Sequence, residues 1–442
     1  MNPLLSPEPT VRLLLGNEAI VRGALEAGLG FFSTYPGTPS SEIGDTFFRI
    51  HQEAGVSFEY SVNEKVALEV AGAAAAAGVR TMVAMKHVGV NVAADPLMTL
   101  AYIGVRAGLV LVSADDPGCH SSQNEQDNRH YARLGKLPMF EPATPQEAYE
   151  TVKAAFELSE KLEMPVILRT TTRVSHTRSA VRFGALGERK TKGEFAPDRR
   201  RFTPVPAVAR LRHPVVEQNM IAAEEQFNDS PLNRLYGSGT FGVLTSGVAA
   251  CYVEDAVVRF ALDDKVRVLQ LATTWPLPRK VLAEFVSQVD AALVVEELDP
   301  LLENELRATC SRTGKLIAVY GKDSGHFSLL GELGPDQVTH ALADLLGFDA
   351  EEGAGAALPA LPARPPILCP GCPHRATYYA VKLVAGDAPL YLSDIGCYTL
   401  GFLPPIGVGD YFICMGSSAS SAGGFAATGD KPVISFIGDS TF

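Results

Sequence analysis

The sequence predicts a multi-domain α/β protein in which parallel sheets are flanked by helices. Short apolar runs alternate with helical patterns from about residue 11 to residue 176, and the same alternation returns over residues 241–297. The runs are apolar on both faces, as in parallel strands that helices cover on both sides. With 442 residues the chain is also too long for a single core of ordinary size.

The first alternating segment follows ordinary helix and turn signals. A helix is expected over residues 19–27, because Gly16-Asn17-Glu18 stands before it and Gly28 ends it. A strand at 31–35 then meets the turn Pro36-Gly37-Thr38-Pro39, and the hydroxyls that follow at Ser40 and Ser41 can cap the next helix. Further strands are expected at residues 58–62, 81–85, 108–113 and 165–170.

Changes of composition divide the rest of the chain after residue 180. Prolines and the basic cluster Arg199-Arg200-Arg201 predict a linker excursion over residues 181–238, with one helix near 214–227. A second α/β unit is expected at 239–350, and an alanine- and proline-rich linker at 351–366. The third domain, 367–442, is expected to be incomplete, because the sequence stops just after an apolar strand. In the second unit we expect strands at 241–247, 266–271 and 291–297, and helices at 248–262 and 279–289.

Composition and charge argue against several classes of function. The formal net charge of -12 disfavours nucleic acid or an anionic membrane as the main partner. The apolar stretches are too short to span a membrane, and the N-terminus has no secretory signal pattern. Seven cysteines, an odd number over a long chain, do not indicate a disulfide framework, so we expect a cytoplasmic protein.

Glu64 is the first candidate catalytic residue, at the start of the helical pattern Asn63-Glu64-Lys65-Val66-Ala67. A carboxylate at a helix N-terminus ordinarily makes only a favourable interaction with the helix dipole. The functional alternative is that Glu64 forms a hydrogen bond with N1' of the aminopyrimidine of thiamine diphosphate. In that case the cofactor supplies the difficult chemistry, and the protein places one proton in a dry site.

Cys369 and Cys372 form a single Cys-x-x-Cys motif, which can be half of a zinc or iron-sulfur site or a redox pair. The remaining candidate ligands, His374, Cys397 and Cys414, are irregularly spaced, so we favour a different interpretation. The motif then forms a tight turn before a helix at 375–384, whose backbone N–H groups and His374 face an anionic cofactor.

Other turns of the third domain have the same character. Ser393-Asp394-Ile395-Gly396-Cys397 and Met415-Gly416-Ser417-Ser418 join strands or turns to helices, where glycines and hydroxyls can surround a diphosphate. Asp439 follows Gly438 after the apolar strand, and a carboxylate there is a candidate ligand for Mg²⁺. Each of these turns can also be no more than a turn.

Six longer motifs strengthen the case. They are LLLGNEA (13–19), YPGTPSSEI (35–43), MKHVG (85–89), SSQNEQD (121–127), CPGCPHR (369–375) and GDSTF (438–442). With them the chain resembles, over nearly its whole length, the alpha-subunit family of indolepyruvate:ferredoxin oxidoreductases, a branch of the 2-oxoacid:ferredoxin oxidoreductases. The resemblance implies oxidative decarboxylation of an arylpyruvate, with coenzyme A as co-substrate. Electrons would pass through [4Fe-4S] clusters to ferredoxin, and the products would be an aryl-acetyl-CoA and CO₂.

The resemblance also implies roles for individual residues. Glu64 would act on the aminopyrimidine, Thr38 with Pro36 and Gly37 would lie near the thiazolium and the substrate, and Lys86 and His87 would face the same pocket. Asp439 would bind Mg²⁺. The residues implied around the diphosphate are Cys369, Gly371, Cys372, His374, Gly396, Cys397, Gly416, Ser417, Gly438, Asp439 and Ser440.

The same resemblance describes the domains and the partners. Residues 1–180 would be the pyrimidine-binding domain, 239–350 a domain like the C-terminal domain of transketolase, and 367–442 the diphosphate- and magnesium-binding domain. A smaller beta- or gamma-type subunit would complete a hetero-oligomer with two-fold symmetry.

The sequence departs from the family pattern at its end. Relatives usually place further Mg²⁺ ligands just beyond the Gly-Asp motif, and often a cysteine-rich ferredoxin-like tail, whereas this sequence stops at Phe442. We expect either a longer polypeptide or a truncated metal site. Two alternatives therefore stay open: a non-oxidative thiamine diphosphate-dependent decarboxylase, and an inactive scaffold fragment.

Overall fold

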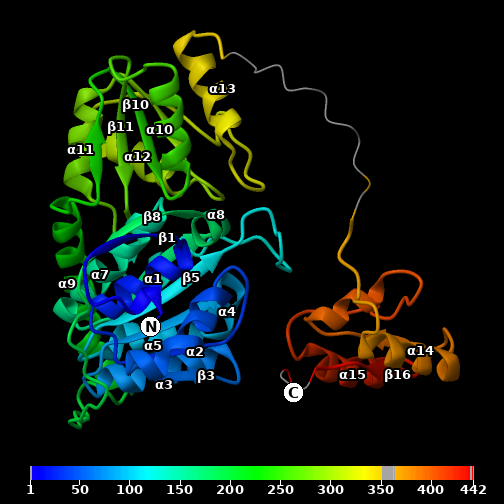
Figure 1. Ribbon diagram of the computed structural model, residues 1–442. Helices are drawn as coiled ribbons and strands as arrows, with labels where there is room; N and C mark the ends of the chain where they lie inside the picture. Colours follow the sequence, from blue (N-terminus) through cyan, green and yellow to red (C-terminus); the bar gives the residue numbers. More distant parts are fainter. Residues whose placement is uncertain (1, 351–361, 363, 439–440, 442) are drawn as a thin grey trace. The chain divides into compact units, whose positions relative to one another are not determined.

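The computed structural model describes residues 2–350, 362, 364–438 and 441. The chain forms two compact units, Met1–Glu351 and Glu352–Phe442, and each is considered by itself. The first unit contains two large sheets with their helices and a two-stranded sheet, and the second contains one small sheet (Figure 1).

A seven-stranded sheet organises the first half of the chain. Its strand order is β12-β6-β7-β5-β4-β2-β3, and every neighbouring pair is parallel except β12 with β6. Strand β4 is buried at every position, as expected for an apolar run inside a sheet that helices cover on both faces. Its bounds lie close to the predicted residues 81–85. The strands are β2 (Phe31–Thr34), β3 (Ser57–Tyr60), β4 (Thr81–Lys86), β5 (Leu109–Asp115), β6 (Met139–Phe140), β7 (Val166–Thr171) and β12 (Thr273–Trp275).

Helices pack on this sheet and bury a continuous apolar core. Asn63 caps α3 by accepting a hydrogen bond from Val66 N at 2.9 Å, and Thr144 caps α7 through Glu147 N at 3.1 Å. Gly55, in the left-handed conformation, ends α2. The helices are α1 (Gly16–Glu26), α2 (Ser41–Ala54), α3 (Glu64–Ala76), α4 (His87–Val92), α5 (Ala94–Ile103), α6 (Arg129–Gly135), α7 (Pro145–Leu162) and α8 (Thr172–His176), after the short 3-10 helix η1 (Pro3–Leu5).

The predicted linker excursion contains more structure than expected. Strand β8 (Arg178–Phe183) pairs antiparallel with β1 (Thr10–Leu15), and four of the six residues of β8 are at least partly exposed, which hides it from an apolar pattern. Helix α9 (Pro206–Asn228) begins earlier than predicted, with Pro206 in the first turn, where its missing N–H costs nothing.

A five-stranded sheet forms the second α/β region, in the order β14-β13-β10-β11-β9. Only β9 runs antiparallel to its neighbour. Strand β12 follows β11 directly in sequence but pairs with β6 of the seven-stranded sheet. The chain therefore crosses from one sheet to the other between β11 and β12. The elements are β9 (Arg234–Tyr236), β10 (Phe241–Ser246), α10 (Ala249–Arg259), β11 (Val266–Leu271), α11 (Arg279–Gln288), β13 (Ala291–Val295), α12 (Leu301–Thr313), β14 (Ala318–Tyr320) and α13 (Pro335–Leu346).

The second unit is small and has a modest core around Leu368, Tyr378, Tyr391 and Val408. Its parallel strands are β15 (Leu390–Leu392) and β16 (Val433–Ser435), and β16 is half-buried rather than fully covered. Its helices are α14 (Pro373–Ala385), α15 (Ser417–Thr428) and the 3-10 helix η2 (Cys397–Phe402).

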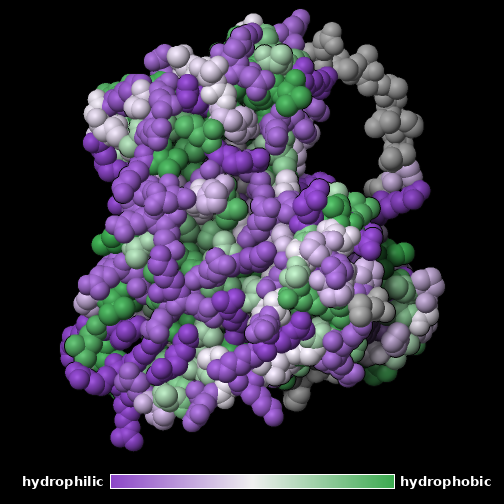
Figure 2. Space-filling model, turned by 60° about the vertical axis from the view of Figure 1, so that its left-hand side comes forward, coloured by the Kyte–Doolittle hydropathy of each residue, from purple (hydrophilic) through white to green (hydrophobic). Residues whose placement is uncertain are grey.

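The surface is mostly hydrophilic. Figure 2 shows one face on which polar residues predominate and apolar residues form separate patches. Within the part of the chain that the structure describes, no helix has both the length and the apolar character needed to cross a membrane.

Candidate active site

The candidate residues of the first unit gather at one edge of the seven-stranded sheet. Strands β3, β2 and β4 are neighbours and parallel, so their carboxyl ends lie side by side. Thr38 follows β2, Glu64 follows β3, and Lys86 ends β4 directly before His87. The carboxyl edge of a parallel sheet is where α/β proteins bind ligands. Gly37 lies against Lys86, since a Cβ added to Gly37 would be 2.9 Å from Lys86 Cβ.

Glu64 is largely withdrawn from water in the first turn of α3. Burial raises the pKa of its carboxyl, and the backbone N–H of Glu64 itself opposes this shift. The start of α4 packs directly on the carboxylate: a Cβ added to Gly89 would come within 2.6 Å of Glu64 Oε1. Glu64 is therefore a half-buried carboxyl with a raised pKa and little room on its α4 side.

His87 presents one free ring nitrogen. Its side chain is fully buried, and Nε2 lies 3.0 Å from Asn124 Oδ1 and 3.3 Å from Asn124 O. Two oxygen acceptors make Nε2 the donor, which leaves Nδ1 as the other ring nitrogen. Nδ1 is buried and has no hydrogen-bond partner among the described residues. A buried polar atom of this kind is expected to meet a ligand or water.

Lys86 is held by the loop of residues 116–128. Its Nζ donates to Ser121 O, and burial lowers the pKa of its amine although Asp116 opposes the shift. Asp116 in turn accepts hydrogen bonds from Ser121 N at 2.9 Å and Thr172 Oγ1 at 2.8 Å. Burial alone would raise the pKa of Asp116, but these bonds and one from Ser122 give a net lowering. Asp116 is thus an anion that orders the loop under Lys86.

The motif SSQNEQD (121–127) lies in this loop, and it supports His87 together with the following Asn128. Asn128 Nδ2 donates to His87 O at 3.1 Å and to Ser113 Oγ at 2.8 Å, and Gln126 Nε2 donates to His87 O at 3.2 Å. Sequence reasoning gave these residues no role of their own. The signal that could have found them is the density of amide side chains just after a predicted strand.

Asn17 is another residue that sequence reasoning left without a role. It is fully buried, and its Nδ2 donates to Pro39 O at 2.7 Å and to Glu42 Oε2 at 2.8 Å. These bonds fix the turn that holds Thr38 against the start of α2. The motif LLLGNEA thus supports the motif YPGTPSSEI, although the two are separate in sequence.

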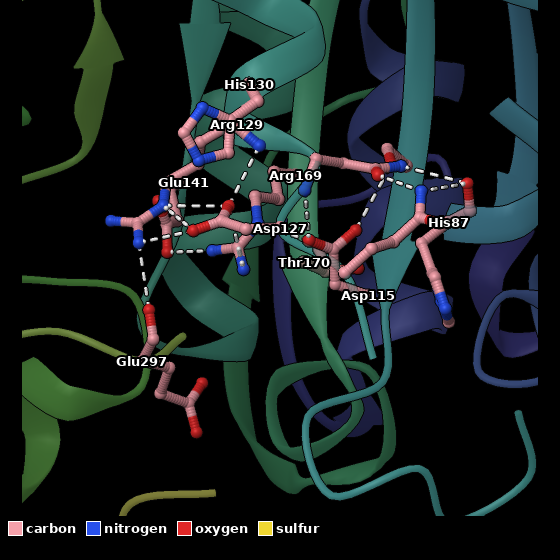
Figure 3. A network of polar contacts seen from close by, with 12 residues as sticks. His87, Asp115, Asp127, Arg129, His130, Glu141, Arg169, Thr170 and Glu297 are labelled. Atoms are coloured by element: carbon pink, nitrogen blue, oxygen red, sulfur yellow. Dashed lines mark hydrogen bonds and ion pairs between the residues drawn. The ribbon is translucent and has the colours of Figure 1, made fainter. Parts of the chain in front are cut away.

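A buried network of ion pairs lies beside this edge and joins the two sheets (Figure 3). Arg129 binds Asp127 Oδ2 and Glu296 Oε2, each at 2.6 Å, and all three side chains are almost completely buried. Arg169 binds Asp115 Oδ2 at 2.7 Å and Glu141 Oε1 at 2.5 Å. Asp115 Oδ2 also accepts from Asn128 N at 3.0 Å, which links the network to the loop that holds His87.

One group of side chains has spacing that suits a metal: Asp127, His130 and Asp299. However, Arg129 Nε contacts both carboxylate oxygens of Asp127 at 3.0 Å, and Arg129 Nη2 lies 2.6 Å from Oδ2. A cation would have to displace a buried guanidinium, so this group does not fit a metal site.

The predicted diphosphate turns of the second unit do come together. Asp394, fully buried, accepts hydrogen bonds from Gly416 N at 2.7 Å and Ser418 N at 3.1 Å, and so ties the turn before η2 to the start of α15. Ser417 Oγ accepts from Ile413 N and Cys414 N at 3.1 and 3.2 Å. Tyr398 Oη lies 3.0 Å from Ile395 O and from Thr441 Oγ1, and its ring blocks any side chain at Gly438.

The cysteine motif occupies the position predicted for it, directly before α14. Gly371 has a left-handed φ of 74°, Cys372 Sγ lies 3.4 Å from His374 Nδ1, and the rings of His374 and Tyr398 are 5.6 Å apart. Cys369 and Cys397 are exposed. Among the described residues these cysteines form no group of three ligands, and the motif forms the turn that leads into α14. Asp439 and Ser440 lie outside the described residues.

These features fit thiamine diphosphate. In the second unit Ser393 Oγ and Ser418 Oγ are buried without hydrogen-bond partners among the described residues, at the turns where a diphosphate would need donors. Helix α15 begins at the turn that holds Ser418, α14 begins at the separate cysteine turn, and helix N-termini favour anions. In the first unit the carboxyl of Glu64 and the free Nδ1 of His87 offer the polar partners that an aminopyrimidine ring and a substrate require.

Comparison with known proteins agrees with this chemistry. The family described as pyruvate flavodoxin/ferredoxin oxidoreductase, thiamine diphosphate-binding, matches residues 22–230. Indolepyruvate oxidoreductase subunit IorA of Methanothermobacter marburgensis is 49% identical over 97% of this chain and 70% of its own length. The protein of the same name from Archaeoglobus fulgidus is 44% identical over the same shares.

A solved structure shows the same fold. The 2-oxoglutarate:ferredoxin oxidoreductase from Magnetococcus marinus, with 2-oxoglutarate, coenzyme A and succinyl-CoA bound, aligns with a TM-score of 0.61. It covers 76% of this chain and 65% of that chain at 16% identity. The chain therefore belongs to the IorA family of indolepyruvate oxidoreductase subunits, which are thiamine diphosphate-dependent 2-oxoacid oxidoreductases.

Proposed function

We propose that the chain contributes to the oxidative decarboxylation of arylpyruvates of the indolepyruvate type. The reaction takes a 2-oxo acid, coenzyme A and two oxidised ferredoxins to an aryl-acetyl-CoA, CO₂, a proton and two reduced ferredoxins. The names of relatives with up to 49% identity support this substrate class. They also favour an oxidoreductase over a non-oxidative decarboxylase or an inactive scaffold.

The observation that supports the proposal most strongly is the pair of buried groups at the sheet edge. Glu64 is a carboxyl whose pKa burial raises, and His87 has a ring nitrogen without a partner among the described residues. A raised pKa favours the protonated form of the carboxyl, as suits a group that exchanges a proton with a cofactor. When bound, thiamine diphosphate supplies the carbanion chemistry of the decarboxylation.

The residues of the first unit then have separate roles. Glu64 exchanges a hydrogen bond and a proton with the aminopyrimidine nitrogen N1'. Lys86, whose amine is fixed by Ser121 O, attracts the carboxylate of the 2-oxo acid, and His87 Nδ1 accepts a hydrogen bond from the substrate side. Thr38, with Pro36 and Gly37, closes the pocket over the strand end.

The second unit would hold the diphosphate and Mg²⁺. Gly371, His374, Gly396, Gly416, Ser417 and Gly438, with Cys369, Cys372, Cys397 and Ser440, would surround the phosphates, and Asp439 would bind the metal. Bare backbone N–H groups at glycine turns are suited to phosphate oxygens. We propose the corresponding domains as 1–180 for the pyrimidine side, 239–350 for the transketolase-like domain and 367–442 for the diphosphate side.

The complete enzyme would need partners. We propose a smaller subunit, [4Fe-4S] clusters elsewhere in the assembly, and ferredoxin as the electron acceptor, in a two-fold hetero-oligomer. The names of the relatives, all subunits, support a multi-subunit enzyme.

The test replaces Glu64 by glutamine in the complete enzyme, with Glu69→Gln as the matched control on the same helix. Glu69 is exposed and, among the residues that the structure describes, forms an ion pair with Lys65 one turn away. We expect Glu64→Gln to abolish ferredoxin reduction by indolepyruvate and coenzyme A. Calorimetry should show thiamine diphosphate affinity within about tenfold of the parent, since one neutral hydrogen bond contributes about 1 kcal/mol. Full turnover by Glu64→Gln would refute the role, and an equal loss in Glu69→Gln would show that the effect is not specific.

A further inference from the structure

Three arginines line a pocket of the first unit that lies away from the sheet edge. Arg12 comes from β1, Arg178 from β8 and Arg49 from α2, and the cavity volume is about 320 Å³. All three side chains are exposed. None of them forms a hydrogen bond or ion pair with another described side chain. In contrast, the fully buried arginines Arg22, Arg129 and Arg169 are all paired with carboxylates.

Asn2, another residue of the pocket lining, also offers a hydrogen-bond donor. Asn2 Oδ1 accepts from Leu4 N at 2.9 Å, so its amide nitrogen is the free end. The one carboxylate in the lining, Glu18, accepts from Leu15 N at 2.9 Å as part of the start of α1. Arg12 pairs with Val181 and Arg178 with Leu15, so these two side chains leave opposite faces of the β1–β8 pair, and each contributes to the lining of the pocket. The chain as a whole carries a net charge of -12, whereas the lining of this pocket carries three arginines and one glutamate and is locally positive.

We propose that this pocket binds a phosphorylated organic molecule. Guanidinium groups present planar pairs of N–H donors that match phosphate oxygens, and here all three cations are arginine rather than lysine. The apolar wall of Leu4, Leu13 and Leu14 suits an organic moiety beside the phosphate. The volume lies at the small end of the range for ligand pockets.

The pocket shares structural elements with the candidate active site but none of its assigned residues. Glu18 stands next to Asn17, which holds the turn of Thr38 through Pro39 O, and Thr46 in the pocket wall donates to Glu42 O at 2.6 Å. A bound anion would therefore tie β1 to α2 just behind that turn. The binding itself does not depend on the proposed reaction, so its test can fail independently.

The test measures anion binding by calorimetry on the protein saturated with thiamine diphosphate and Mg²⁺, so that the diphosphate site is filled. The probes are ATP, pyrophosphate and citrate at matched ionic strength. We expect ATP to bind with a stoichiometry of one, pyrophosphate to bind more weakly because it lacks the organic part, and citrate to bind weakest. Arg49→Gln and Arg178→Gln should each weaken ATP binding at least tenfold.

The matched control is Arg210→Gln on α9, an exposed arginine that likewise forms no hydrogen bond or ion pair with the described residues. It should leave ATP binding unchanged, and all three variants should keep the parental unfolding midpoint. The proposal is overturned if ATP does not bind saturably, or if Arg49→Gln and Arg178→Gln bind as the parent does. Citrate binding as tightly as ATP would overturn the phosphate class. Variants that weaken only association with a partner subunit would show a protein interface instead.

Discussion

Replacing Arg129 by methionine should test whether the buried ion network holds the two sheets together. The guanidinium binds the carboxylates of Asp127 and Glu296, each at 2.6 Å, and donates to the carbonyls of Glu297 and Asp299 at 2.9 and 2.8 Å. Methionine keeps much of the apolar length but removes every one of these bonds. Two carboxylates would then be buried without their cation.

The size of the effect follows from what each carboxylate keeps. Breaking a buried pair from one side costs about 3–5 kcal/mol. Asp127 keeps Arg169 at 3.8 Å, and Glu296 keeps the N–H groups of Leu302 and Glu303, both at 2.9 Å. We therefore expect a loss near the lower end, about 3 kcal/mol. Burial by itself would raise the pKa of Asp127, whereas Arg129 and Arg169 hold it well below its usual range.

The assay is urea unfolding followed by tryptophan fluorescence, since Trp275 on β12 lies beside the joined sheets. With a slope of about 3 kcal/mol per molar urea, the midpoint should fall by about 1 M. Arg133→Met is the matched control one turn further along α6, because its pair with Glu305 is long, at 3.6 Å, and half-exposed, and should cost less than about 1 kcal/mol. Since the Arg133 guanidinium also lies 5.3 Å from the centre of the Trp275 ring, the midpoints are checked by circular dichroism as well. The double variant Arg129→Met, Glu296→Leu should recover part of the loss. Equal midpoints for Arg129→Met and Arg133→Met would refute the reasoning.

Three further predictions address the site and its surroundings. Gly89→Ala should abolish 2-oxoacid oxidation, because the added Cβ would lie 2.6 Å from Glu64 Oε1. Circular dichroism should show little loss of secondary structure in this variant. The control Gly423→Ala should stay active, because a Cβ there meets no atom within 4 Å. Asn17→Ala should lower the free energy of unfolding by about 1–3 kcal/mol, because it removes the hydrogen bond to the Pro39 carbonyl. The variant should also raise KM for the 2-oxo acid more than it lowers kcat. An unchanged KM would contradict a role of Asn17 in holding the Thr38 turn. Burial raises the pKa of Glu297 from an ordinary 4.5 to about 7, so the folded state binds the proton of this carboxyl more tightly than the unfolded state does. The free energy of unfolding should therefore fall by about 3 kcal/mol as the pH rises from about 4.5 to about 7. Glu297→Gln should remove that slope in urea titrations at several pH values, and an unaltered slope would assign it to other groups.

The sequence by itself determined the main parallel strands of the first sheet. Strand β4 was expected at 81–85 and lies at Thr81–Lys86, because a strand covered on both faces must be apolar at every position, and that run is visible without any partner. The resemblance to a known family, and not the strand pattern, implied that Thr38, Glu64, Lys86 and His87 share a pocket; in the structure they lie at the common edge of neighbouring parallel strands. The turns at Gly371, Gly396 and Gly416 were also found from local signals.

Only the tertiary structure decided which distant segments meet. Arg129 and Glu296 are 167 residues apart, and no local pattern distinguishes this buried pair from exposed charges. Strand β12 joins the first sheet although it follows β11 of the second, and β8 pairs with β1 from within a segment that looked irregular. The free Nδ1 of His87 likewise depends on Asn124, which lies on another loop. Periodicity reports whether a residue is covered, whereas the identity of the covering residue depends on chain crossings that periodicity does not encode.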